Sequence, residues 1–137
     1  MKYSADDFCA YYHSILAAAV TDATTEGTTV DCKGFDEALV VFDATLAAAN
    51  AEGNLKVQES SDDSTWADVA GAAFTEITPS NDADSFEGRI DLSKRSRYLR
   101  LHLTTDGSNA FTGSGGFVLI HPKYGPASHN NTVVFDV

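Results

Sequence analysis

The most constraining feature of the sequence is a stretch with the pattern of a β-hairpin, residues 55–69. Leu55 and Val57 alternate with Lys56 and Gln58, and this period of two places one row of side chains in a core and the other in water. The residues that follow are mostly Asp and Ser, which bend the chain or hydrogen-bond to their own backbone, before an apolar pattern resumes. The stretch therefore predicts two antiparallel strands joined by a polar turn.

Trp66, the only tryptophan of the chain, follows this turn directly. A large aromatic side chain at the end of a hairpin gains most by folding over the end of the core. We therefore expect Trp66 to be buried. The predicted core combines it with apolar positions of the expected strands, namely Leu39, Val41, Val57, Leu99, Leu101, Leu103, Val118 and Ile120.

Several other segments have the composition of strands. They alternate between apolar and polar residues or are rich in β-branched and aromatic ones, and clusters of Gly, Pro, Asp, Asn and Ser separate them. The expected strands are residues 13–20, 28–32, 38–44, 74–77, 86–92, 98–104 and 117–120. Residues 47–54 are expected to form a loop, and residues 1–12 an N-terminal arm or a short helix.

Short strands separated by turns, without a long amphipathic helix, predict an all-β domain. The expected architecture is an antiparallel jelly-roll-type β-sandwich, and an immunoglobulin-like sandwich is the alternative. A chain of 137 residues fits one domain. We therefore expect residues 13–137 to form a single sandwich.

The charge of the chain restricts its partners. Twenty Asp and Glu residues against nine Lys and Arg give a formal net charge of -11, so the protein should repel nucleic acids and anionic membranes. The longest apolar run, residues 15–20, is too short to span a bilayer. Cys9 and Cys32 are too few for a disulfide scaffold, and we expect buried free thiols in a protein made in a reducing cytoplasm.

No arrangement of residues in the sequence indicates catalysis. The histidines are scattered, and no serine lies in a Gly-x-Ser-x-Gly elbow. The zinc-binding spacings Cys-x-x-Cys and His-x-x-x-His are also missing. We expect no enzyme, no metal and no cofactor.

Two charged clusters have open interpretations. The acidic loops offer oxygen ligands for calcium, but they contain no complete calcium motif and also suit a solvated turn. The basic cluster suits either a carboxylate-rich partner or a strand edge kept soluble by charge. The acidic residues are Asp62, Asp63, Asp68, Asp82 and Asp84, and the basic residues are Lys94, Arg95, Arg97 and Arg100.

Three segments in order resemble the small decoration, or cement, proteins that coat the heads of tailed bacteriophages. They are residues 39–42 (Leu-Val-Val-Phe), residues 57–69 (Val-Gln-Glu-Ser-Ser-Asp-Asp-Ser-Thr-Trp-Ala-Asp-Val) and residues 94–101 (Lys-Arg-Ser-Arg-Tyr-Leu-Arg-Leu). Where the family's hairpin usually has a glycine after the aspartate, this chain has Ser64. The resemblance implies a non-enzymatic sandwich, commonly a homotrimer, on the outer surface of the virion capsid in contact with several copies of the major capsid protein.

The residues expected to contact such partners are the two tyrosines near the start, the basic cluster and the apolar end of the chain. They are Tyr11, Tyr12, Lys94, Arg95, Arg97, Val133, Val134 and Phe135. The alternative function is a carbohydrate-binding β-sandwich, in which Trp66 or Tyr98 stacks on a sugar ring. Fold alone does not choose between these two functions.

Overall fold

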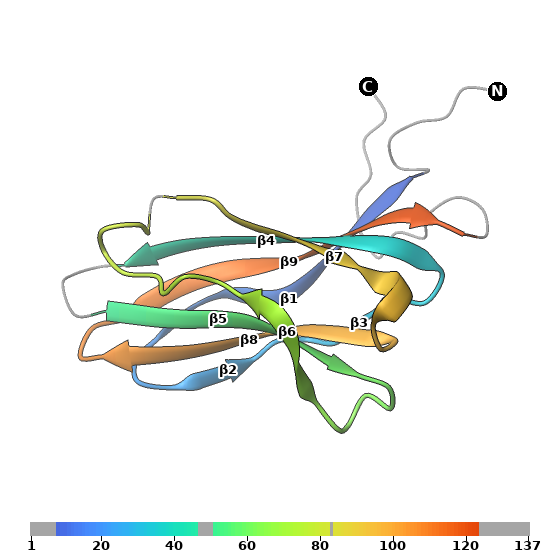
Figure 1. Ribbon diagram of the computed structural model, residues 1–137. Helices are drawn as coiled ribbons and strands as arrows, with labels where there is room; N and C mark the ends of the chain where they lie inside the picture. Colours follow the sequence, from blue (N-terminus) through green and yellow to red (C-terminus); the bar gives the residue numbers. More distant parts are fainter. Residues whose placement is uncertain (1–7, 47–50, 83, 124–137) are drawn as a thin grey trace.

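The computed structural model describes residues 8–46, 51–82 and 84–123, and these form the predicted all-β sandwich (Figure 1). Among them no helix is long and apolar enough to cross a membrane. A single 3-10 turn, η2 (Leu92–Lys94), interrupts the strands of this described part. The strands are β1 (Cys9–Val20), β2 (Thr24–Glu26), β3 (Val30–Asp31), β4 (Phe35–Leu46), β5 (Ala51–Ser60), β6 (Ala67–Ala73), β7 (Phe86–Asp91), β8 (Tyr98–Gly107) and β9 (Phe111–Pro122).

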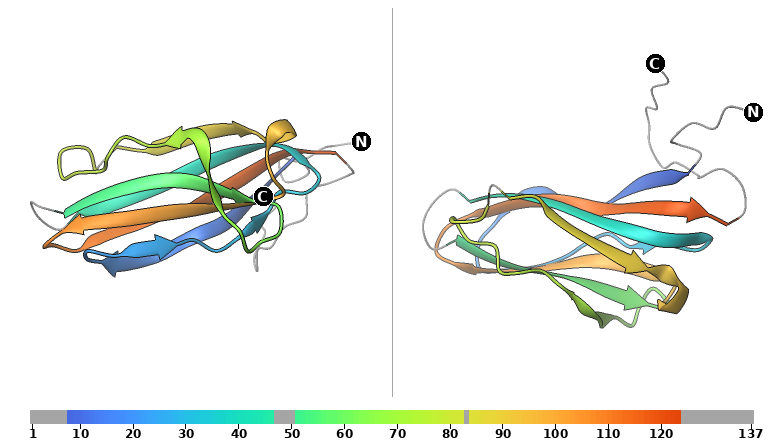
Figure 2. Two further views of the ribbon diagram at one scale, coloured as in Figure 1. Left: turned by 60° about the horizontal axis from the view of Figure 1, so that its bottom comes forward. Right: turned by 45° about the horizontal axis from the view of Figure 1, so that its top comes forward.

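The strands form two antiparallel sheets that face each other (Figure 2). The first sheet has the order β1-β9-β4-β7, and the second has the order β2-β8-β5-β6, with β3 also paired to β8. The chain passes repeatedly from one sheet to the other, as between β4 and β5 or between β8 and β9. This wrapping is the jelly-roll arrangement that the sequence predicts.

The alternation of β5 and β8 correctly predicts the core on the side of the second sheet. Leu99, Leu101 and Leu103 have at most 1% of their surface exposed, as do Leu55 and Val57 on the neighbouring strand. Each such side chain contributes roughly 1.5–3 kcal/mol by leaving water. These two strands therefore supply much of the apolar surface that holds the sheets together.

On β4 the predicted core is wrong by one residue. The side chains that point into the sandwich are Ala38, Val40 and Phe42, each at most 1% exposed, whereas Leu39 and Val41 are half-buried on the outer surface. Residues 38–42 are all apolar, so the sequence does not show which alternate residues point inward. A shift of one residue exchanges the two faces of a strand. Packing against the other sheet decides which residues of β4 face the core.

The same correction applies to β9, where Val118 and Ile120 point outward. The glycines expected to precede this strand lie inside it, because the strand already begins at Phe111. A Cβ atom on Gly113 would lie 2.5 Å from the ring of Phe42. The glycine thus leaves room for this ring and that of Phe111, which stack with centroids 6.5 Å apart.

Several elements also differ from the prediction, and the unpredicted strand β2 is one of them. β1 begins at Cys9, so residues 9–12 belong to the sandwich and not to an arm or a helix. β5 begins at Ala51, which converts part of the expected loop into strand. Residues 74–77 form no strand and contribute only one isolated bridge, between Ile77 and Gly53.

Trp66 does not join the core, contrary to the prediction. The ring is half-buried, and the guanidinium of Arg100 lies 4.3 Å from its centroid. Arg100 lies on β8 between Leu99 and Leu101, whose side chains are buried, so it points to the outer surface of the second sheet. The cation–π contact with this arginine thus holds Trp66 on the outer surface.

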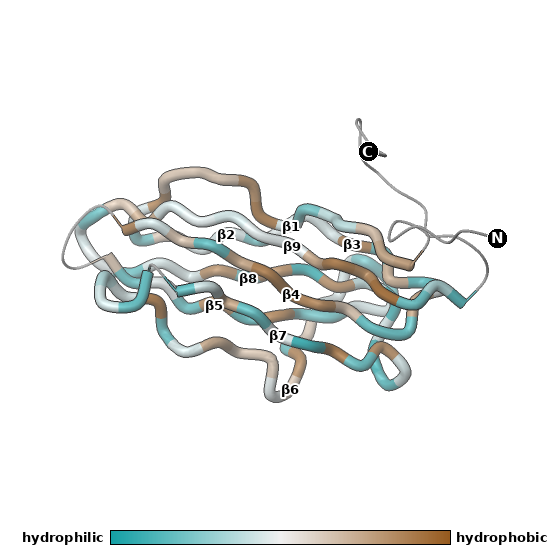
Figure 3. The backbone as a smooth tube through the Cα atoms, turned by 90° about the horizontal axis from the view of Figure 1, so that it is seen from above, coloured by the Kyte–Doolittle hydropathy of each residue, from teal (hydrophilic) through white to brown (hydrophobic). Residues whose placement is uncertain are grey.

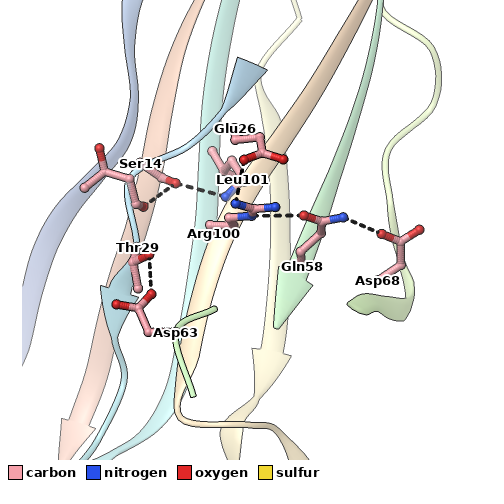
Figure 4. Close-up of polar contacts among 9 residues, drawn as sticks. Ser14, Glu26, Thr29, Gln58, Asp63, Asp68, Arg100 and Leu101 are labelled. Atoms are coloured by element: carbon pink, nitrogen blue, oxygen red, sulfur yellow. Dashed lines mark hydrogen bonds and ion pairs between the residues drawn. The ribbon is translucent and has the colours of Figure 1, made fainter. Parts of the chain in front are cut away.

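Ser14 links the two sheets beside β1 (Figure 4). Its hydroxyl, only 3% exposed as part of the residue, donates a hydrogen bond to the Thr28 carbonyl (2.9 Å) and accepts one from the Leu101 amide (2.9 Å). A β-bulge follows His13 at this point of β1. A Cβ atom on Gly27 would lie 2.2 Å from the Ser14 oxygen, so only glycine allows this close approach.

We predict that Ser14→Ala lowers the free energy of unfolding by about 1–3 kcal/mol, because it leaves the buried Leu101 amide without its acceptor. Urea denaturation followed by circular dichroism measures the change. Ser108→Ala, at an exposed bend, is the control and should stay within about 0.5 kcal/mol of the original protein. Equal stabilities of the two variants would contradict this role of Ser14.

Candidate interaction surfaces

Apolar residues gather on the outer side of the first sheet, on a surface that we call the apolar face. In Figure 3 the neighbouring strands β4 and β9 both have hydrophobic stretches. The central row of the apolar face consists of Tyr11, Val118 and Leu39, paired across β1, β9 and β4. Val41 and Ile120 extend it on the same side of the sheet, since side chains two residues apart on a strand share a face. All five are half-buried. The apolar face therefore keeps part of its apolar surface in contact with solvent.

Charged and polar groups border the apolar face. Arg89 on β7 forms a salt bridge with Glu37 on β4, so these two charges neutralise each other at one edge. At the other edge the Tyr11 hydroxyl lies 3.4 Å from Nδ1 of His13. Burial, and to a lesser degree the negative charge of Asp43, raises the pKa of Tyr11, which keeps its hydroxyl protonated at neutral pH.

Tyr12 lies next to Tyr11 on β1 but packs against the core. Both tyrosines, together with Leu16 and Val30, line a hollow of about 240 Å³ beside β1. Burial, followed by the charge of Asp31, raises the pKa of Tyr12 as well. Of the two tyrosines expected to contact a partner, Tyr11 alone lies on the apolar face.

Two arginines of the predicted basic cluster are paired with carboxylates of the chain. Arg95 forms a salt bridge with Glu59 (3.1 Å), and Arg97 donates two hydrogen bonds to Asp31 (3.0 and 2.7 Å). The pairing with Arg97 lowers the pKa of Asp31. Lys94 is exposed, and in the described part of the chain it forms no salt bridge.

The third arginine, Arg100, belongs to a polar network on the outer side of the second sheet (Figure 4). It donates hydrogen bonds to Gln58 and to Glu26, both 3.0 Å long. Gln58 in turn donates to Asp68 (2.9 Å), which also binds Lys56 (2.8 Å). The two outer surfaces of the sandwich therefore differ in chemistry, apolar on the first sheet and densely hydrogen-bonded on the second.

The acidic turn of the hairpin uses its own carboxylates. Asp62 Oδ1 accepts hydrogen bonds from the amides of Ser64 (3.0 Å) and Thr65 (2.8 Å) and from the Ser60 hydroxyl (2.8 Å). Asp63, with a positive φ of 59°, accepts one from Thr29 (2.7 Å). Among the described residues no group of three or more His, Cys, Asp or Glu is placed to hold a metal ion.

Neither Cys9 nor Cys32 is in a disulfide bond in the described part of the chain, as expected. Cys32 is buried, and this burial raises its pKa to about 12, so its thiol is protonated and unreactive at neutral pH. Cys9 is only half-buried, which corrects the expectation that both thiols are buried. The apolar residues Val133, Val134 and Phe135 lie outside the described residues.

One solved structure supports the fold assignment. The sandwich is similar to the crystal structure of the SPBc2 prophage-derived protein YomS, with a TM-score of 0.51 and 10% sequence identity, over 80% of this chain and 92% of that chain. No protein-family model and no curated protein matches the sequence. At such low identity the likeness establishes the fold alone.

The sequence prediction places four residues of the apolar face, Leu39, Val41, Val118 and Ile120, in the core and only Tyr11 at a contact with a partner. The available signal was that both alternating sets of β4 are apolar: Leu39 and Val41 in one set, Val40 and Phe42 in the other. A strand with two apolar faces must bury one of them outside its own sandwich or leave it partly exposed. The pairing of Trp66 with Arg100 had no comparable signal, since 34 positions separate them (100 − 66).

The Asp62 turn should make stability depend on pH. The hydrogen bonds from Thr65 and Ser64, then that from Ser60, lower the pKa of Asp62. A lowered folded-state pKa stabilises the fold above the unfolded value of about 3.9, and this stabilisation is lost as the pH falls toward the folded value. We predict that Asp62→Ala lowers the melting temperature at pH 7 and that the difference narrows progressively below about pH 4.

Asp84→Ala is the matched control, since in the described part of the chain the Asp84 carboxylate accepts no hydrogen bond. Its melting temperature should follow that of the original protein at every pH. Thermal unfolding of the three proteins across this range measures the effect. A constant difference between Asp62→Ala and the original protein at all pH values would contradict the assignment.

Proposed function

We propose that this protein is a non-enzymatic structural component of a bacteriophage virion that binds the outer capsid surface and stabilises contacts between subunits of the major capsid protein. The observation that carries the proposal is the likeness of the sandwich to a prophage-derived protein over most of both chains. The resemblance of residues 39–42, 57–69 and 94–101 to phage decoration proteins points independently to the same source.

The apolar face is the surface best suited to contact the shell. On the outer side of the second sheet, Arg100 and Asp68 bind neighbouring side chains, although Nδ1 of His102 has no hydrogen-bond partner among the described residues. The apolar face, by contrast, leaves apolar surface to be covered. The His121 amide donates to the Phe8 carbonyl (2.9 Å). Both ends of the described chain therefore leave the first sheet at one end of this face, and terminal segments are free to reach neighbouring molecules.

Binding of this kind stabilises a capsid without catalysis. A protein that contacts more than one capsid subunit binds the assembled shell and not the free subunit, so mass action favours the shell. We propose a homotrimer, because closed symmetric oligomers are the usual solution and an icosahedral lattice offers three-fold positions. The net charge of -11 disfavours contact with the packaged nucleic acid and with membranes.

Carbohydrate binding is the less favoured function. A sugar-binding site requires an aromatic ring with an accessible face, but the guanidinium of Arg100 lies over the Trp66 ring and that of Arg97 lies 4.9 Å from the Tyr98 centroid. Both rings are also half-buried. Each ring proposed for stacking therefore has one face occupied by an arginine of the chain.

The test is to add the purified protein to undecorated heads and to measure co-sedimentation and the temperature at which the heads release DNA. We expect binding and a higher release temperature. Val118→Asp, between Tyr11 and Leu39 in the central row, should weaken binding about tenfold or more, because docking would then bury an unpaired carboxylate. Far-ultraviolet circular dichroism checks that the variant remains folded.

The matched control is Thr104→Asp, which places the same carboxylate at an exposed position of the second sheet. This variant should bind heads as the original protein does. Equal loss in both variants would remove the apolar face from the proposal. If the unaltered protein does not co-sediment and a glycan screen gives a specific ligand, the carbohydrate-binding function replaces the proposed one.

A further inference from the structure

A groove runs between β6 and β7, the strands at the same side of the two sheets. It consists of two adjoining hollows of about 220 Å³ each, which share Gly71, Ala72, Arg89 and Ile90. Val57 contributes to its apolar floor, and Ile90 is 7% exposed. We call it the β6–β7 groove. The groove has an apolar floor and charged walls, and its elongated form suits an extended peptide better than a compact ligand.

Both strands that flank the groove are edge strands. In the described part of the chain β7 pairs with β4 only, and β6 pairs with β5 only. A register shift between Lys56 and Gln58, with Gly71 at a φ of 80°, bends β6 away from its neighbour. An edge strand offers backbone amide and carbonyl groups that an added strand can pair with. The free edge of β7 is therefore a template for one more strand.

The groove carries charges of both signs, because Glu87 lines one hollow and Asp91 lines the other together with Lys94 and Arg95. Arg95 is paired with Glu59, and Lys94 forms no salt bridge in the described part of the chain. The Arg89 side chain is 74% exposed and lies on the outer side of β7, since Ile90 next to it points inward. Arg89 is already paired with Glu37, so an added strand would be held mainly by backbone pairing and apolar contacts, and an acidic residue on its outer side would lie beside Arg89.

The chain contains one segment with these properties, residues 132–137, Thr-Val-Val-Phe-Asp-Val, which lie outside the described residues. β-Branched and aromatic residues give it strand propensity. In an extended conformation Val133, Phe135 and Val137 share one side, and Asp136 lies on the other. With the apolar side in the groove, Asp136 would face outward, on the same side as Arg89.

We propose that residues 132–137 of one copy add as a strand to the free edge of β7 in a second copy, with Val133, Phe135 and Val137 in the β6–β7 groove. This inference rests on the self-association put forward with the proposed function. Residues 124–131 connect the segment to Lys123, and at roughly 3.3 Å per residue they reach about 26 Å. That length is sufficient for the segment to leave its own sandwich.

The arrangement explains how a trimer would close. The donated segment and the receiving groove are different surfaces, so the contact is heterologous, and such contacts form a ring when the rotation between copies closes. Three copies, each giving one strand and receiving one, leave no β7 edge unpaired. The apolar face of the first sheet takes no part in this contact and stays available to the capsid.

Two variants separate the donor from the receiver. Deletion of residues 132–137 removes the strand but keeps the groove, and Ala72→Trp fills the groove but keeps the strand. Light scattering at micromolar concentration should give a trimer for the original protein and a threefold lower mass for each variant. Ala17→Trp, at an exposed position of β1, is the control for the bulky side chain and should remain a trimer. Circular dichroism checks the fold of each protein.

Mixing the two variants gives the decisive result. One intact strand and one intact groove remain in the mixture, so a one-to-one heterodimer should form although neither variant associates alone. A mixture that stays monomeric, or an Ala72→Trp protein that still forms trimers, would overturn the inference. Occupation of the groove by the segment of the same chain would appear as a monomeric original protein.

The head-binding assay keeps the two proposals separate. If the original protein binds heads as a monomer, the strand exchange is wrong and the proposed function stands. If it forms the groove-dependent trimer but does not bind heads, the proposed function fails while the exchange stands.

Discussion

The buried hydroxyl of Ser14 holds together the side of the sandwich where β1 of the first sheet meets β8 of the second. β2 and β3 pair with successive parts of β8. Between these parts the Leu101 amide donates its hydrogen bond to the Ser14 hydroxyl instead of to a backbone carbonyl. A buried amide without an acceptor would cost about 1–3 kcal/mol. The hydroxyl also requires glycine at position 27. The closure of this side therefore depends on two small residues and on the β-bulge that brings Ser14 inward.

The opposite side of the sandwich is built differently. β6 bends away from β5 and leaves the β6–β7 groove, so the two sheets are not joined there by a comparable hydrogen bond among the described residues. The two sides of the sandwich therefore differ in how the sheets meet. A buried hydrogen bond joins them beside β1, and the β6–β7 groove lies between them on the other side.

The outer surfaces of the two sheets differ in how strongly they interact with water. On the second sheet one hydrogen-bonded network gives a hydrated surface with little tendency to bind another protein. The network joins the side chains of Arg100, Gln58, Glu26, Asp68 and Lys56. On the first sheet apolar side chains meet in the centre, and the charged pair of Glu37 and Arg89 lies at the edge. Water is displaced more favourably from the apolar face, and this difference makes it the surface suited to a protein partner.

The sequence by itself determined the fold class, the hairpin of β5 and β6 and the inward residues of β8, because strict alternation allows only one phase there. It also determined the acidic charge. Only the tertiary structure decided which face of β4 and β9 is outside, since both faces are apolar and the choice depends on how Phe42, Phe111 and Gly113 fit together across the sheet. It likewise decided that Trp66 lies beneath Arg100 outside the core. Such choices arise from contacts between residues far apart in the chain, which local patterns do not encode.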